Sequence, residues 1–158
     1  MTTLDMTVST WSAAAEMHTK TVWSVAPVLK VGTDYTQAIR NHVDYLIEQF
    51  FLGDEELTAA SLWLKLATLA LNAHPSLDRE FVSETLCKKQ RDYGPDNIAR
   101  FSHKGLILRL HDKVARLENL LMSGADAQNE SLEDTYMDII GYSVIGMMLL
   151  DGSFFYPM

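Results

Sequence analysis

The sequence is short of cysteines and of positive charge, and each shortage excludes a class of protein. A single cysteine, Cys87, excludes a disulfide framework and a cysteine-rich zinc site, and is typical of a reducing compartment. The 13 Lys and Arg residues stand against 21 Asp and Glu residues, a formal net charge of −8. Such a surface repels a nucleic-acid backbone, so no nucleic-acid polymer is expected as a partner. A free nucleotide remains compatible with this charge, because one basic pocket or one bound cation outweighs the average locally.

Long hydrophobic runs and a secretory leader pattern are also missing. The most apolar stretch, Ile139 to Leu150, covers about a dozen residues, whereas a membrane-spanning helix needs roughly 20. The first ten residues contain no basic region followed by an apolar run. We therefore expect no association with a membrane and a cytoplasmic location, which is the host cytoplasm if a phage encodes the chain.

Hydrophobic residues are plentiful, and their spacing indicates helices. They make up 47% of the chain and recur at intervals of three and four, whereas no segment alternates apolar and polar residues long enough to predict a strand. The pattern predicts an all-α bundle of about five helices, formed by one domain over residues 34–158 and preceded by an N-terminal arm or short helix over residues 1–33. The expected helices cover residues 34–52, 54–73, 76–91, 104–122 and 130–150.

Charged residues gather on one face of the expected helix 104–122. Arg109, Asp112, Lys113 and Arg116 fall within about a 100° sector beside a stripe of leucines. One interpretation is a solvated surface with an ion pair between Asp112 and Arg116. The other is a phosphate clamp with one metal-binding acid, and the spacing alone does not separate the two.

Acidic residues line one side of the last expected helix. Glu130, Asp134 and Asp138 are spaced four apart, with Glu133 beside them. The acids of the first turn have an ordinary explanation, because Ser131 and Asp134 resemble a capping box and the helix dipole favours negative charge there.

Asp138 lies beyond the first turn, between apolar neighbours, so we expect its carboxylate to be half-buried and to have a partner. A divalent cation shared with Asp134 is one candidate, and oxygen ligands of this kind favour Mg²⁺ or Mn²⁺ over zinc. A salt bridge to Arg109 or Arg116 is the alternative.

A third cluster joins Lys88, Asp92, Tyr93 and Gly94, with Asn97 close behind. A turn of this composition brings backbone N–H groups, a cation and an aromatic ring to one ligand. The same residues also suit the C-terminus of a helix, where cations and a glycine stop are favoured.

Taken together, the three clusters resemble the nucleotide-modification-associated family (type 1), which is common in phages. The resemblance covers roughly Glu84 to Leu150 and rests on the order and spacing of three blocks. These blocks are Lys88-xxx-Asp92-Tyr93-Gly94, Arg109-xx-Asp112-Lys113-xx-Arg116-Leu117 and Glu130-xx-Glu133-Asp134-xxx-Asp138-xxx-Tyr142.

The resemblance implies a relation to the all-α, MazG-like nucleotide pyrophosphohydrolases, in which a helical bundle holds Mg²⁺ and splits a nucleoside triphosphate into a monophosphate and pyrophosphate. It assigns catalysis to Asp112, Lys113 and Asp138. The implied metal ligands are Asp112, Glu130, Glu133, Asp134 and Asp138, and the implied nucleotide-binding residues are Lys88, Asp92, Tyr93, Asn97, Arg109, Lys113 and Arg116. The wider group uses Glu-xx-Glu and Glu-xx-Asp pairs, from which the acids of this chain depart.

Three hypotheses for the function follow. The first is a Mg²⁺- or Mn²⁺-dependent hydrolase of deoxynucleoside triphosphates in phage nucleotide metabolism. The second is a non-catalytic protein that binds or sequesters a nucleotide during phage infection. The third is a helical interaction protein whose acidic stripe only solvates its surface. A homodimer or homotetramer is expected, because the apolar C-terminal residues exceed what one small bundle easily buries. The alternative is that this tail folds back over the core of its own chain.

Overall fold

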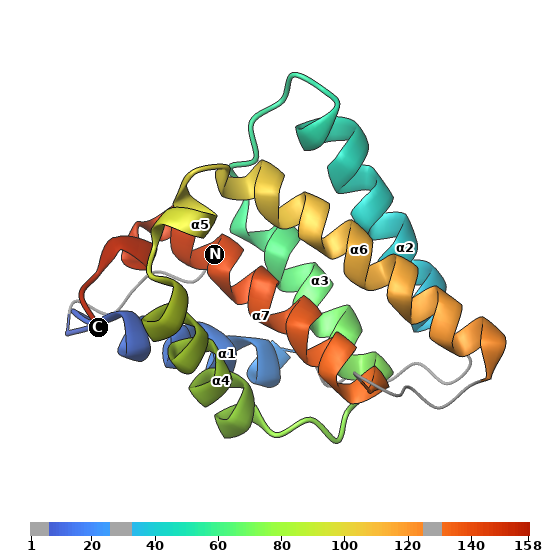
Figure 1. Ribbon diagram of the computed structural model, residues 1–158, viewed down its shortest axis with the longest axis horizontal. Helices are drawn as coiled ribbons and strands as arrows, with labels where there is room; N and C mark the ends of the chain where they lie inside the picture. The colour runs from blue at the N-terminus through green and yellow to red at the C-terminus, as the bar shows by residue number, and fades with distance from the viewer. Residues whose placement is uncertain (1–6, 26–32, 125–130) are drawn as a thin grey trace.

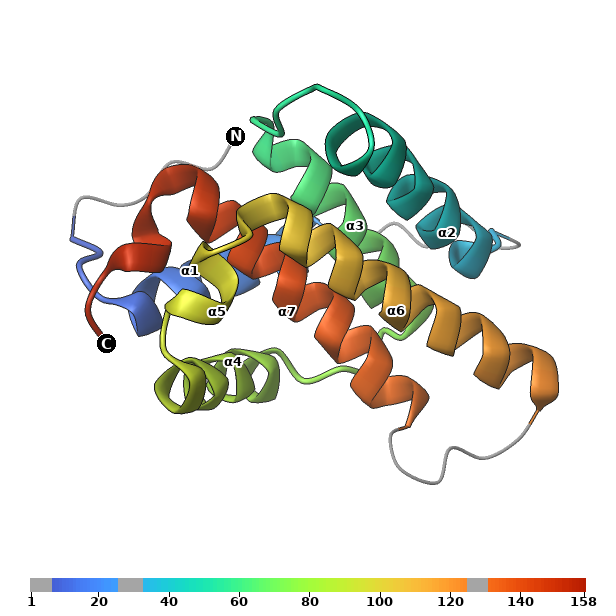
Figure 2. The same cartoon turned by 45° about the horizontal axis from the view of Figure 1, so that its top comes forward.

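The computed structural model describes residues 7–25, 33–124 and 131–158, and in these ranges it contains helices and no β-strand. The predicted all-α class is confirmed. The helix α7 runs through the centre of the bundle, with α3 and α6 along one side and α1 and α4 along the other (Figures 1 and 2). The α-helices are α1 (Trp11–Val25), α2 (Tyr35–Leu46), α3 (Ala60–Ala73), α4 (Arg79–Tyr93), α5 (Asp96–Ala99), α6 (Ser102–Ser123) and α7 (Leu132–Asp151). A π-helical turn, η1 (Ile47–Phe51), extends α2, and a 3₁₀ turn, η2 (Ser153–Phe155), follows α7.

Local signals in the sequence set several helix ends. The predicted capping box is present at α7, where the Ser131 side chain accepts from the Asp134 N–H and the Asp134 side chain accepts from the Ser131 N–H. Gly124 ends α6 with a φ of 62°, and Gly94 ends α4 with a φ of 68°. Glycine adopts these left-handed angles without the steric cost that a side chain adds.

Two predicted helix starts are wrong. The helix α3 begins at Ala60 rather than at Asp54, because the non-helical segment 54–59 carries Leu57 into the core with only 4% of its surface exposed. The helix α4 begins after Asp78, whose side chain accepts from the Glu80 N–H, rather than near Ser76. It also continues through Tyr93, beyond its predicted end.

The helix α1 packs against α4 and α7, and its buried residues belong to the same hydrophobic core as those of the later helices. Its first residue is tied to the end of the chain, since the Trp11 backbone N–H donates to the carbonyl of Pro157 at 2.8 Å. The Trp11 indole also meets Phe154 edge-on, with ring centroids 6.2 Å apart. The buried residues of α1 are Trp11, Ala14, Ala15, His18, Thr19 and Val22.

A close helix contact joins α3 to α7. Trp63 is fully buried there, and a Cβ atom at Gly146 would lie 2.3–2.5 Å from three atoms of its indole ring, so only glycine leaves room for it. The Trp63 indole N–H donates to Nδ1 of His103 at 3.1 Å, and the two rings stack. Burial lowers the pKa of His103 to about 4, which keeps the imidazole neutral and able to accept this hydrogen bond.

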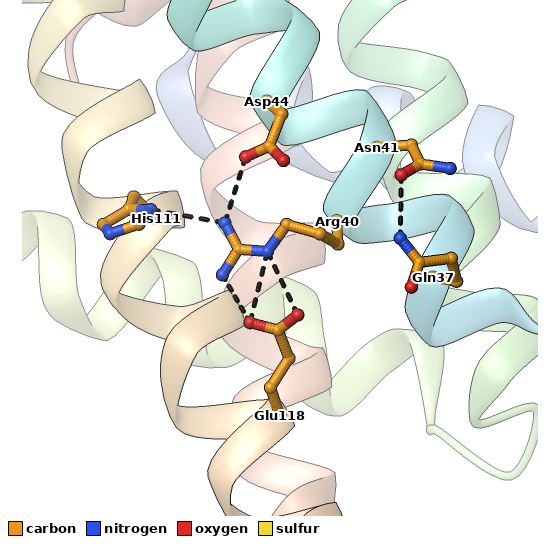
Figure 3. Close-up of polar contacts among 6 residues, drawn as sticks. All are labelled: Gln37, Arg40, Asn41, Asp44, His111 and Glu118. Atoms are coloured by element: carbon orange, nitrogen blue, oxygen red, sulfur yellow. Dashed lines mark hydrogen bonds and ion pairs between the residues drawn. The ribbon is translucent and has the colours of Figure 1, made fainter.

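Ionic contacts join α2 to α6 (Figure 3). The Arg40 guanidinium reaches across from α2, and its Nε donates to both carboxylate oxygens of Glu118 at 3.1 and 3.2 Å. It also donates to Asp44 at 3.2 Å and to Nδ1 of His111 at 3.3 Å. The hydrogen bond from Arg40 holds the pKa of the Glu118 carboxyl below its usual value. Each of the three guanidinium nitrogens therefore has at least one partner within the protein itself.

The described part of the chain contains no helix whose length and apolar character would let it cross a membrane.

Candidate functional site

A cavity of about 330 Å³ lies beside the central helix, bounded by α4, α5, α6 and α7. Its wall combines an apolar surface with a small set of charged and polar side chains, which is the usual character of small-molecule sites. The apolar lining consists of Val82, Leu86, Ile98, Met137, Gly141 and Ile145. The polar lining consists of Thr85, Lys89, Gln90, Tyr93, Asn97, Arg109, Asp138 and Tyr142.

An ionic junction of three helices forms one side of this cavity. Asp138 of α7 accepts from Lys89 Nζ of α4 at 3.1 Å through Oδ1 and from Lys113 Nζ of α6 at 2.7 Å through Oδ2. The Asp138 side chain is 13% exposed, Lys113 is 21% exposed and Lys89 is 53% exposed. Burial alone would raise the pKa of the Asp138 carboxyl, but the two lysines outweigh burial and lower it. The carboxylate is thus ionised at neutral pH.

Two further groups on the cavity wall lack a partner. Arg109 lines the cavity, and no acidic side chain pairs with it among residues 7–25, 33–124 and 131–158. The side-chain oxygen of Asn97 is buried and receives no hydrogen bond within the same ranges. An unmatched cation and an unmet acceptor on one wall are what an anionic, hydrogen-bonding ligand would satisfy.

The structure brings part of the predicted site together. Tyr93, Asn97, Arg109 and Asp138 all line the cavity, and Lys113 reaches it through its contact with Asp138. The half-buried state and the need for a partner that the sequence predicted for Asp138 are both observed. Its partners within the protein are Lys89 and Lys113, however, rather than the predicted Arg109 or Arg116.

Other predicted nucleotide-binding residues do not line this cavity. Lys88 and Asp92 are exposed and are not part of the cavity wall. Arg116 is half-buried farther along α6 and is not part of the wall. The catalytic candidate Asp112 is exposed and also lies outside the wall.

The predicted metal ligands are not gathered around one point. No three acidic, histidine or cysteine side chains lie close enough to share a metal ion in the portion of the chain that the structure describes. Asp134 caps α7, Asp138 is held by two lysines and Glu133 is exposed. Glu130 lies outside the described residues. The described side chains therefore do not fit a resident Mg²⁺ or Mn²⁺ ion, because Asp138 is already neutralised by two lysines and no second and third acid lie beside it.

Sequence reasoning missed several residues of the wall. Lys88 was predicted as a site residue, but its neighbour Lys89 lines the cavity. Neighbouring side chains on a helix point about 100° apart, so the two lysines do not face the same site. Gly141 was missed as well, and a Cβ atom there would lie 2.9 Å from Cδ2 of Leu86, so the absence of a side chain brings α4 and α7 together. A glycine inside a helix was the available signal, since it is unfavourable there without a packing reason.

Comparison with known proteins gives a result for the second half of the chain alone. No curated protein and no solved structure matches the chain. A family model does match, over residues 89–150, which is less than half of the chain but contains Lys89, Arg109, Lys113 and Asp138. The resemblance to the nucleotide-modification-associated family predicted from the sequence is thereby confirmed for this segment: residues 89–150 match the model of the nucleotide modification associated domain 1.

Proposed function

We propose that the protein binds a small nucleotide in the cavity between α4, α5, α6 and α7. The observation that carries this proposal is Arg109, which has no acidic partner among the described residues and shares a wall with Lys89 and an apolar surface. The family description, which refers to nucleotide modification, supports the same ligand class. The net charge of −8 does not oppose it, because the local wall carries more positive than negative side chains.

The two kinds of lining suit the two ends of a nucleotide. Lys89 and Arg109 present N–H donors and positive charge for a phosphate. The apolar side chains Leu86, Ile98 and Met137 offer a surface for a planar base. The unmet oxygen of Asn97 accepts from an amino group or a hydroxyl, and the exposed Tyr93 ring is available for stacking.

Calorimetric titration tests the proposal directly. The common ribo- and deoxynucleoside mono-, di- and triphosphates are titrated into the wild type in EDTA and again with Mg²⁺. Arg109→Met should weaken binding at least tenfold, because a charge-assisted hydrogen bond contributes about 1.5–3 kcal/mol. Lys104→Met is the matched control, since Lys104 is an exposed cation of the same helix outside the cavity wall.

The proposal fails if the wild type binds none of these nucleotides at millimolar concentration. It fails equally if Arg109→Met and Lys104→Met bind as tightly as the wild type, because the ligand would then occupy another surface.

Hydrolysis is the second candidate function, and the ionised Asp138 on the cavity wall is the observation that favours it. The proposed reaction joins water and a deoxynucleoside triphosphate to give a deoxynucleoside monophosphate and pyrophosphate. The resemblance to MazG-like enzymes is the further support for it, with Asp112, Lys113 and Asp138 as the proposed catalytic residues. The divalent ion is then part of the substrate, arriving on the triphosphate.

A screen for products decides between binding and hydrolysis. The protein is incubated with each triphosphate and Mg²⁺ or Mn²⁺, and monophosphate and pyrophosphate are measured by chromatography. Asp138→Asn should abolish turnover while the helical circular dichroism is unchanged. Tight binding without any product would leave nucleotide binding or sequestration as the function, and full turnover by Asp138→Asn would refute the catalytic assignment.

We also propose that the protein forms a homodimer or homotetramer. The exposed apolar side chains Phe101, Leu108 and Met122 of α6 and its N-terminal flank support this. Light scattering after size-exclusion chromatography measures the mass, and a single species of 17.8 kDa would contradict the proposal.

A further inference from the structure

The wall of the cavity already carries an anion that belongs to the protein, the carboxylate of Asp138. The inference drawn from it rests on the proposed binding of a nucleotide in this cavity. Asp138 accepts hydrogen bonds from Lys89 and Lys113 with its two oxygens. These are the interactions that a phosphate oxygen would make with the same ammonium groups. The carboxylate also lies on the same wall as Arg109, so an entering phosphate meets its negative charge as well as the cations.

We propose that Asp138 is an internal competitor of the ligand's phosphate for Lys89, so that the carboxylate limits how tightly a bare nucleotide binds. Entry of the phosphate moves the Lys89 ammonium from Asp138 to the ligand. Asp138 then remains on Lys113, which keeps the carboxylate from being left without a partner.

Exposure and position distinguish the two lysines. Lys89 is 53% exposed, lines the cavity and sits on α4, so its long side chain is able to turn without disturbing the packing. Lys113 is only 21% exposed, and its contact with Asp138 is the shorter of the two, at 2.7 Å against 3.1 Å. The weaker and more exposed contact is the one that a ligand displaces.

The α2–α6 contact shows what a purely structural ionic contact looks like in the same molecule (Figure 3). There, Arg40 is 15% exposed and is surrounded by two carboxylates, and no cavity residue takes part. At Asp138 the arrangement is inverted: one carboxylate faces two lysines, with the unpaired Arg109 on the same wall. Among the side chains that line the cavity, the cations Lys89 and Arg109 outnumber the single carboxylate of Asp138, so an anionic ligand would balance the charge of this wall.

Replacing the carboxylate by its neutral isostere tests the idea. Wild type and Asp138→Asn are titrated in EDTA and low salt with inorganic phosphate and with each of the four common deoxynucleoside monophosphates. We expect Asp138→Asn to bind about five- to tenfold more tightly. Asp96→Asn is the matched control, because Asp96 is an exposed acid next to Asn97 in the sequence that lies outside the cavity wall. It makes the same change in net charge and should stay within about twofold of the wild type.

A double-mutant cycle shows whether Lys89 is the shared partner. Lys89→Gln should weaken binding, and the gain from Asp138→Asn should disappear when Lys89 is also glutamine. A gain that survives in the double variant would overturn the assignment of Lys89. Asp138→Ser repeats the test with a smaller neutral side chain in case Asp138→Asn loses its helical circular dichroism.

The remaining outcomes separate this inference from the proposed function. If the wild type binds a nucleotide and Asp138→Asn binds it equally or more weakly, the competitor role is overturned while nucleotide binding stands. If binding is detected only after Asp138 is neutralised, the competitor role is supported. If neither the wild type nor any Asp138 variant binds phosphate or nucleotide, both proposals are overturned.

Discussion

The two sides of α7 differ in how completely its partners cover it. Toward α3, Gly146 admits the fully buried Trp63 against the helix backbone, and the indole N–H has its acceptor in His103. Toward α4, Gly141 meets only the end of the Leu86 side chain, and a cavity with charged groups remains beside it. At Gly146 the large indole ring occupies the space that a side chain would take, and the helix contact is closed. At Gly141 the smaller leucine side chain leaves a cavity that could hold a ligand.

The largest expected effect on stability is at the closed contact between α3 and α7. Gly146→Ala should lower the free energy of unfolding by about 3 kcal/mol, because the new methyl group overlaps the rigid indole of Trp63. Gly141→Ala is the matched control and should change stability far less, since the end of Leu86 is able to turn away. It should instead weaken nucleotide binding by narrowing the cavity. Denaturant titrations of both variants measure the difference, and equal losses would remove the distinction between the two sides.

The pH dependence of stability sharpens the same contrast. The pKa of His103 is lowered by burial from about 6.5 in an unfolded chain to about 4. Its contribution is therefore complete above pH 6.5 and is lost as the pH falls toward 4, because only the unfolded state takes up the proton readily. The loss should reach about 2 kcal/mol by pH 4.5. His103→Gln should lack this dependence, and parallel stability curves for wild type and variant would contradict the sealed environment.

On the side of α7 that faces the cavity, stability should depend on Lys113 more than on Lys89. Lys113→Met should lower the free energy of unfolding by about 1–2 kcal/mol, because it deprives the largely buried Asp138 of its shorter hydrogen bond. Lys89→Met should have little effect on stability, since Lys89 is more than half exposed. Thermal unfolding in the absence of nucleotide compares the two. The reverse order would place the structural role on Lys89 and leave Lys113 to meet the ligand.

The smallest effect is expected at the α2–α6 contact. Arg40→Met should cost about 0.5–1 kcal/mol, because both partner carboxylates are more than a third exposed and water replaces the lost interaction. Nucleotide affinity should not change. Lys20→Met is the control, since it removes an exposed i, i+4 pair with Glu16 and should leave stability within error. A change in affinity for Arg40→Met would show that this contact is coupled to the cavity.

The sequence predicted the later helices better than the earlier ones, and the reason is the kind of residue at the buried positions. In α6 the buried positions are large aliphatic residues, Leu106, Leu110, Val114 and Leu117 among them, so the helical period was plain. In α1 the buried positions 11, 14, 15, 18, 19 and 22 follow the same period, but they include alanines, a histidine and a threonine. A search for regularly spaced large apolar residues therefore misses the helical period of α1, because small and polar residues occupy many of its buried positions.

The features of the site that depend on a single helix were predictable from the sequence, whereas the contacts between helices were not. Burial of Asp138 followed from its apolar neighbours, and the shared face of Arg109 and Lys113 followed from their spacing on one helix. The identity of the partners did not, because the position of α4 beside α7 is a tertiary property, and it places Lys89 rather than Lys88 on the cavity wall. The predicted metal site needed Asp112, Asp134 and Asp138 to face a common point, and this depends on how α6 and α7 are rotated about their axes, which the spacing within each helix does not determine.

The link between Trp11 and Pro157 has a consequence for how the molecule forms during synthesis on the ribosome. The first turn of α1 is translated more than a hundred residues before its backbone acceptor, Pro157, and before the ring of Phe154. Until those residues are translated, the Trp11 indole lacks its native contact with Phe154 and stays exposed or loosely packed. Contacts so distant in sequence are slow to close, so completion of the bundle should be among the last steps of folding rather than a local early event.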